Sequence, residues 1–76
     1  MIDDPLDELA EDREAAARRA EEGMREALRE AADRSNDGLT RAQALARSRV
    51  LRSQAEDLWE EAARFRAGEI PDQYEF

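Results

Sequence analysis

The 76-residue chain contains no cysteine, no histidine and no lysine. The absence of cysteine excludes disulfides and thiolate metal sites, and it leaves the redox compartment open. Acid–base and nucleophilic catalysis rely mainly on histidine, lysine, cysteine or a serine beside a base. Ser35, Ser48 and Ser53 have no base in evident reach, and the Glu-x-x-His pairs of di-iron bundles cannot be built. We therefore expect no enzymatic activity and no cofactor or metal site.

Long apolar runs are also missing. Residues 1–5 read Met-Ile-Asp-Asp-Pro, which is neither a basic leader nor an apolar segment, and no stretch approaches the ~20 apolar residues of a membrane span. The net charge of −8 and the pI near 4.5 oppose binding to duplex nucleic acid or to an anionic membrane. The expectation is a soluble cytoplasmic protein without a membrane partner.

Residues 5–34 carry the signals of a long helix. Asp4 is suited to cap it, Pro5 fits the first helical position, and no further proline follows before residue 71. The segment is rich in alanine, the strongest helix former, and Gly23 is its one weak position. Its inward positions recur at alternating steps of four and three residues: Leu6, Ala10, Arg13, Ala17, Ala20, Met24, Ala27 and Ala31.

A second helix is predicted over residues 39–67. The four turn formers of residues 35–38 precede it, and its first residue lies near Thr40, which forms a capping box with Gln43, or near Asp37. Gly68 is suited to end it. The same heptad-like spacing recurs at Ala44, Ser48, Leu51, Ala55, Leu58, Ala62 and Phe65. The fold class is therefore all-α: an antiparallel helical hairpin over residues 1–67, followed by an extended C-terminal tail over residues 68–76.

The charge pattern predicts how two hairpins would pair. Residues 38–55 contain four arginines and no acid, whereas residues 1–14 are strongly acidic. Neither block is expected to meet its opposite within one chain, and one layer of two helices leaves each apolar seam half exposed. We therefore predict an antiparallel homodimer, a four-helix bundle. The residues assigned to its charge pairing are Arg41, Arg47, Arg49 and Arg52 against Asp3, Asp4, Asp7, Glu8 and Glu11.

Aromatic residues are few, and half of them lie in the last three positions. Trp59 borders the predicted seam, and tryptophan is a frequent interface anchor. In the tail, Ile70, Tyr74 and Phe76 are spaced among acids, a pattern suited either to folding back on the bundle end or to docking on another protein. The predicted function is a small acidic module that binds an unidentified partner protein, either as a regulator such as an antitoxin or inhibitor, or as an assembly adaptor.

RNA binding is the alternative function. Arg41, Arg49 and Arg52 fall within about 80° on a helical wheel and form a ribbon suited to phosphate contacts. The layout of two helices that pair antiparallel into a four-helix bundle resembles that of the Rop family, and this resemblance of layout implies RNA binding. The same arginines are also suited to the acidic helix of a second copy, which is the interpretation we favour.

Overall fold

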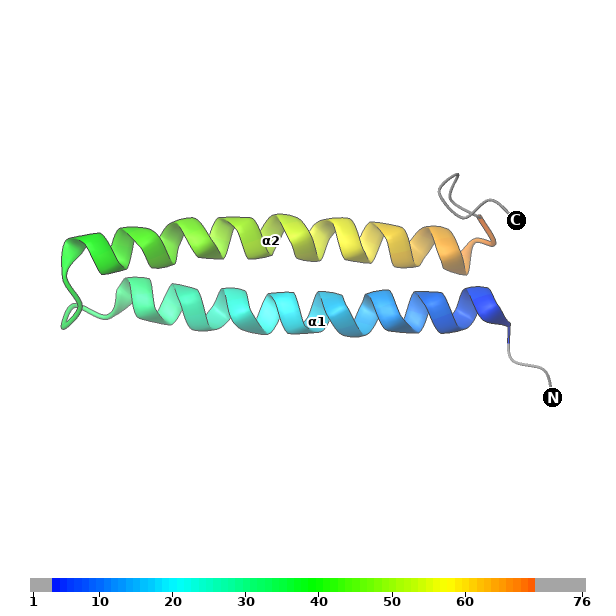
Figure 1. Cartoon of the computed structure of the whole chain (residues 1–76), viewed down its shortest axis with the longest axis horizontal. Coiled ribbons are helices and arrows are strands. Elements are labelled where there is room, and N and C mark those ends of the chain that lie inside the picture. Colours follow the sequence, from blue (N-terminus) through cyan, green and yellow to red (C-terminus); the bar gives the residue numbers. More distant parts are fainter. Residues whose placement is uncertain (1–3, 70–76) are drawn as a thin grey trace.

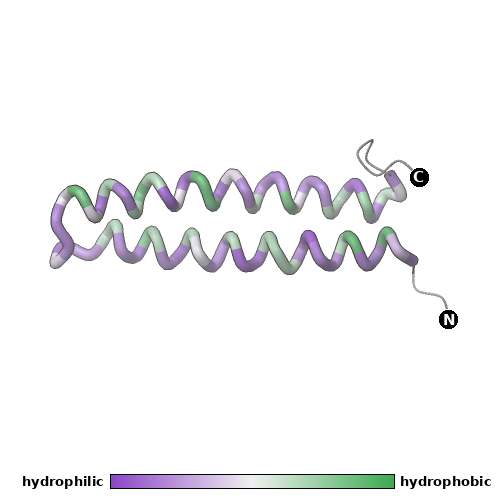
Figure 2. The backbone as a smooth tube through the Cα atoms, viewed as in Figure 1, coloured by the Kyte–Doolittle hydropathy of each residue, from purple (hydrophilic) through white to green (hydrophobic). Residues whose placement is uncertain are grey.

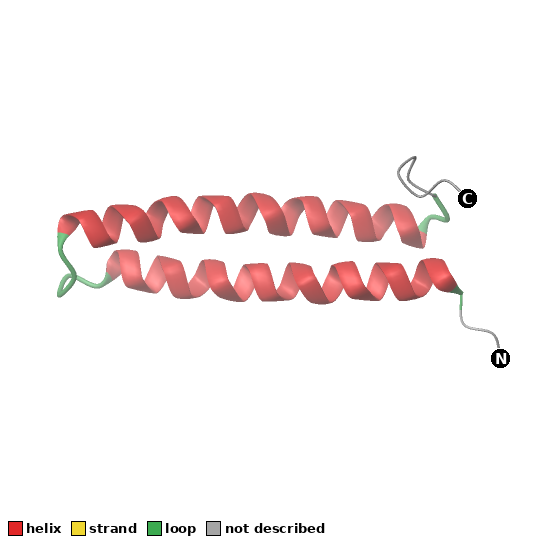
Figure 3. Cartoon of the chain, in the orientation of Figure 1, coloured by secondary structure: helices red, strands yellow, loops and turns green. Residues whose placement is uncertain are grey.

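The computed structural model describes residues 4–69. It contains two long helices, α1 (Pro5–Ala32) and α2 (Gly38–Arg66), joined by a short turn and packed side by side in opposite directions (Figure 1). Both ends of the described chain lie at the end of the hairpin away from the turn, and residues 4–69 contain no strand (Figure 3). The molecule extends 53 × 26 × 16 Å, so it is one helical layer thick. The predicted all-α hairpin is confirmed.

α1 begins as predicted and ends earlier than predicted. The Asp4 carboxylate accepts a hydrogen bond from the Leu6 amide at 2.9 Å, which caps the helix. The last helical residue is Ala32 rather than Arg34, because Asp33 leaves the helical region at φ −74° and ψ 108°. Its carboxylate accepts from the Ser35 amide at 2.9 Å and from the Ser35 hydroxyl at 2.7 Å. This local turn replaces the last helical hydrogen bonds.

α2 begins one residue before the predicted position. Asp37 is the N-cap, since its carboxylate accepts a hydrogen bond from the Thr40 amide at 2.7 Å. Thr40 therefore lies inside the first turn of α2 and is not its cap. At the other end Gly68 adopts φ 83°, a conformation that favours glycine. The Gly68 and Glu69 amides then donate to the carbonyls of Phe65 and Arg64, the pattern of a Schellman motif. α2 therefore ends at Arg66, with Ala67 as its cap.

The core is a narrow band of small side chains between the helices. In Figure 2, apolar segments recur along each helix with polar segments between them. Every buried residue of the described chain lies on a predicted seam: Ala10, Ala17, Ala20 and Ala27 from α1, and Ala44, Ser48, Ala55, Ala62 and Phe65 from α2. Larger seam residues such as Met24, Leu51 and Leu58 are half-buried. Alanine allows close helix packing but buries little area, so one layer leaves apolar surface uncovered.

The two polar residues on the seams have partners. The Arg13 Nε donates to the Glu61 carboxylate at 2.8 Å, and its guanidinium carbon lies 5.9 Å from the centroid of the Phe65 ring. The Ser48 hydroxyl donates to the Leu45 carbonyl of its own helix at 2.6 Å. Within the part of the chain that the structure describes, no buried side-chain nitrogen or oxygen lacks a hydrogen bond. The polar seam positions therefore do not open the core.

Candidate functional site

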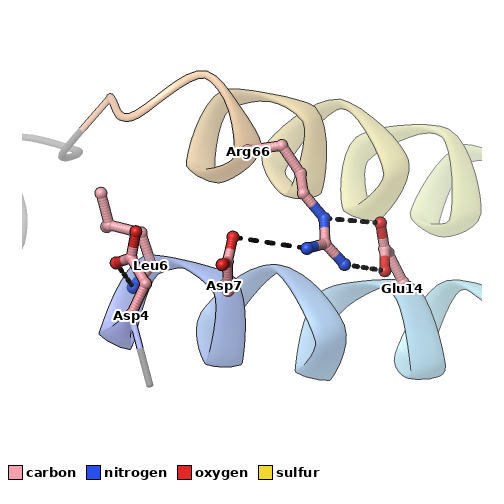
Figure 4. Close-up of polar contacts among 5 residues, drawn as sticks. All are labelled: Asp4, Leu6, Asp7, Glu14 and Arg66. Atoms are coloured by element: carbon pink, nitrogen blue, oxygen red, sulfur yellow. Dashed lines mark hydrogen bonds and ion pairs between the residues drawn. The ribbon is translucent and has the colours of Figure 1, made fainter. Parts of the chain in front are cut away.

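The end of the hairpin away from the turn is held by an ion-pair cluster. Arg66 on α2 reaches across to α1, where its Nη2 lies 2.9 Å from a Glu14 carboxylate oxygen and its Nη1 lies 3.4 Å from Asp7 (Figure 4). The hydrogen bond from Arg66 lowers the pKa of Glu14 below its ordinary value, and the same bond raises the pKa of Arg66. Asp7 thus has a partner inside its own chain, while Asp4 serves as the α1 cap.

The sequence predicts that the basic run of α2 meets no acidic block within the chain, and in the structure three of its arginines have single partners there. Arg47 forms an ion pair with Glu30 on α1, and Arg41 donates from Nε to the Ala31 carbonyl at 2.8 Å. Arg52 lies 3.5 Å from Glu56 on its own helix. The pairing of these arginines and of Arg49 with Asp3, Asp4, Asp7, Glu8 and Glu11 of a second copy stays a prediction.

Charge separates along the long axis of the hairpin. The half that contains the turn, residues 19–52, holds eight arginines and six acids, a net charge of +2. The remainder, residues 1–18 and 53–76, holds four arginines and fourteen acids, a net charge of −10. We call these the turn half and the terminal half. The antiparallel packing brings the acidic start of α1 beside the acidic end of α2, so the end of the hairpin away from the turn is strongly acidic.

An apolar hollow opens on the surface near the turn. It is an open hollow of about 410 Å³, lined by Leu28, Ala31, Ala32, Gly38, Arg41, Ala42 and Leu45. Leu28 and Leu45 are 43% and 40% exposed. Neither the heptad spacing nor the charge pattern of the sequence predicts this hollow. The available signal was a leucine on each helix at a similar distance from the turn.

Trp59, the predicted partner-binding residue of α2, is half-buried. The guanidinium carbon of Arg18 lies 5.7 Å from the centroid of its ring, a cation–π contact across the helix pair. The other predicted partner-binding residues, Ile70, Tyr74 and Phe76, lie outside the described residues, as does Asp3. The structure therefore does not place the tail relative to Trp59.

The described chain is suited neither to a metal site nor to a membrane span, and three surface features remain for a partner. Residues 4–69 contain no group of three or more acidic side chains arranged to hold a metal ion. Neither α1 nor α2 offers an apolar stretch of the length needed to cross a bilayer. The features that remain are the charge separation, the hollow near the turn and Trp59.

Comparison of the chain with protein-family models, with curated proteins and with solved structures gave no match.

Proposed function

We propose that this chain is a small acidic protein–protein interaction module. Two hairpins pair antiparallel into a homodimeric four-helix bundle, and the dimer binds a basic surface of another protein, as a regulator such as an antitoxin or inhibitor, or as an assembly adaptor. The observation that carries the proposal is the charge separation between the turn half, at +2, and the terminal half, at −10.

Electrostatics favours the antiparallel arrangement over the parallel one. Antiparallel stacking places the terminal half of each copy over the turn half of the other, so opposite net charges meet. Parallel stacking would place two halves of charge −10 against one another. The two-fold symmetry of this arrangement places α2 of one copy over α2 of the other in the opposite direction, so the exposed Arg49 of one copy faces the acidic second half of α2 in the other. This pairing is isologous, which is the commonest form of homodimer.

The thin core supplies a second reason for pairing. A single layer 16 Å thick has no opposite layer to cover its half-buried residues, among them Met24, Leu51 and Leu58. Small domains bury only about 60% of their unfolded surface, and oligomerisation is a common remedy. A second hairpin would cover one whole face of the first.

Protein binding is better supported than RNA binding. Pairing does not change the net charge of −8 per chain, so a dimer is strongly acidic, which suits a basic protein surface and repels a phosphate backbone. In addition, Arg41, Arg47 and Arg52 each already contact an acceptor within their own chain. RNA binding through these arginines is therefore the less supported alternative.

Sedimentation equilibrium tests the dimer directly. At micromolar concentration we expect the mass of two chains, and we expect the dissociation constant to rise with salt because the pairing is electrostatic. Arg49→Glu should weaken the dimer, because it removes positive charge from the turn half that faces the terminal half of the second copy. Arg29→Glu makes the same charge change at an exposed position of the turn half outside the predicted pairing and should have a smaller effect. A mass of one chain would refute the dimer.

Capture of the native partner on the full-length protein tests the class of target. A protein partner should stay bound after ribonuclease treatment and should dissociate with increasing salt. Tyr74→Ala combined with Phe76→Ala should weaken this binding if the tail contributes to it. Loss of the captured material on ribonuclease treatment would instead support the RNA-binding alternative.

A further inference from the structure

One flank of α2, beside the seam, presents four residues at intervals of seven: Leu45, Arg52, Trp59 and Arg66. Residues seven apart lie on the same side of a helix. The contacts of this column agree, because Arg66 reaches α1 at Glu14, Trp59 contacts Arg18, and Leu45 lies in the hollow near the turn. One side of the hairpin therefore carries an apolar hollow towards one end and a half-buried tryptophan towards the other.

Symmetry decides what this side would meet in the proposed dimer. Stacking two hairpins antiparallel about a two-fold axis places α2 of one copy over α2 of the other, in the opposite direction. Arg52 is the middle residue of α2 (Gly38–Arg66), so full overlap of the two helices places the axis there. Leu45 and Trp59 each lie seven residues from Arg52, about 10 Å along the helix. Leu45 of one copy then lies opposite Trp59 of the other.

We propose that, in the antiparallel dimer, Trp59 of each copy inserts into the hollow near the turn of the other. This inference rests on the proposed dimer and assigns its main contact. The hollow is lined mainly by alanine and leucine side chains, which suit the apolar face of an indole ring. Arg41, which also lines the hollow, is held by the Ala31 carbonyl and supplies a cation for the face of the ring. Two-fold symmetry forms the contact twice.

The same register brings Arg52 of both copies close to the axis. Each Arg52 lies 3.5 Å from Glu56 of its own helix, so each cation is accompanied by a carboxylate and the repulsion between the two arginines is reduced. In a competing register the two-fold axis lies half a heptad further along α2, towards its C-terminal end. That register would place Leu45 of one copy beside Arg66 of the other. Matching of the apolar residues favours the register at Arg52.

Fluorescence tests the insertion because Trp59 is the only tryptophan of the chain. We expect its emission to shift to shorter wavelength as concentration rises, in step with the dimer fraction from sedimentation. Leu45→Glu should abolish the shift and weaken the dimer by about tenfold or more. Val50→Glu, at a residue 57% exposed and outside the column, should leave both unchanged. Far-UV circular dichroism establishes that each variant retains its helices.

Cross-linking distinguishes insertion from general proximity. The chain has no native cysteine, so full-length Leu45→Cys and Trp59→Cys variants can be mixed and equilibrated with oxidised glutathione. We expect the mixed disulfide between these two variants to form about tenfold faster than the mixed disulfide between Val50→Cys and Trp59→Cys. Products in which each variant is linked mainly to a second copy of itself would overturn the assignment.

The outcomes separate this inference from the proposed function. A dimer whose Trp59 emission does not change with concentration, or whose disulfide between positions 45 and 59 is not enriched, overturns the insertion and leaves the antiparallel dimer in place. A single-chain mass throughout overturns both.

Discussion

The two halves of the hairpin share one helical seam and differ in how it is covered. In the terminal half, Phe65 is fully buried, and two interhelical ion pairs join the helices, one from Arg13 on the seam and one from Arg66 beside it. Among residues 4–69, the exposed large apolar residues all lie in the turn half: Leu28, Leu39, Leu45 and Val50. The same heptad pattern therefore builds one end that is closed by its own side chains and one end that is left apolar and open.

The buried residues explain this difference. The turn half contributes only Ala20, Ala27, Ala44 and Ser48 to the core of the described chain, and its exposed leucines and valine occupy positions outside the seam. In the terminal half, Phe65 fills the space between the helices, and Arg13 covers its ring. Stability and acidic charge are thus concentrated at one end, and apolar binding surface at the other.

Truncation of Phe65 should produce the largest difference between the halves. Phe65→Ala removes the largest fully buried side chain and should lower the free energy of unfolding by about 3–5 kcal/mol. Leu45→Ala in the turn half should lower it by about 1 kcal/mol or less in the monomer, because that side chain is already 40% exposed. Urea denaturation at low protein concentration, followed by Trp59 fluorescence, measures both. Equal losses would mean that the two halves are packed equally well.

The seam that carries this contrast was predictable from the sequence. The alternating steps of four and three identified Ala44, Ser48, Ala55, Ala62 and Phe65, and all five are buried. This succeeded because helical periodicity is a local property that places residues on one face whatever the partner helix is. The same logic correctly placed Arg13 on the α1 seam, where an arginine is unexpected.

Features that depend on competition or on helix register were not predictable in the same way. α1 stops at Ala32 because the side chain of Asp33 bonds to Ser35, a local alternative that outweighs helix propensity. The Arg47–Glu30 pair and the hollow between Leu28 and Leu45 depend on the alignment of the two helices. Sequence spacing determines the face of each helix but leaves this alignment undetermined.

Gly23→Ala should narrow the contrast by a smaller amount, because it stabilises the loosely packed turn half. Gly23 lies inside α1, where glycine is about 0.5–1 kcal/mol less favourable than alanine. An added Cβ would lie 3.3 Å from a terminal methyl of Leu51, a flexible and half-buried side chain that can shift. We expect a gain of about 0.5 kcal/mol in the free energy of unfolding, measured by urea denaturation.

Gly38→Ala is the matched control for this gain. Gly38 is the first residue of α2, and a Cβ there would meet nothing within 4 Å. Its effect should be smaller, since the first turn of a helix depends less on propensity than the interior does. Destabilisation by Gly23→Ala would show that Leu51 is held in place and that the turn half is packed more tightly than its exposed leucines indicate.

The smallest expected effect is the change in the free energy of unfolding with pH, which depends on different interactions at the two ends of the hairpin. Glu14 in the terminal half has its pKa lowered mainly by Arg66, whereas Asp33 and Asp37 near the turn have their pKa values lowered by hydrogen bonds from Ser35 and Thr40. A carboxylate with a lowered pKa stabilises the fold above its ordinary pKa and loses that contribution as pH falls through the lowered value. Both ends should therefore lose stability on acidification.

Salt should separate these two contributions. The stability difference between the native protein and Glu14→Gln should be present at neutral pH, vanish as pH falls through the lowered pKa of Glu14, and shrink in 1 M salt, where the Debye length is about 3 Å. In an Arg66→Gln background the difference should be small at every pH, because the cation that lowers the pKa is gone. Asp37→Asn should show a pH-dependent difference that salt changes little, since its partner is uncharged. An equal response to salt at both ends would mean that the acidic end is held by hydrogen-bond geometry rather than by charge.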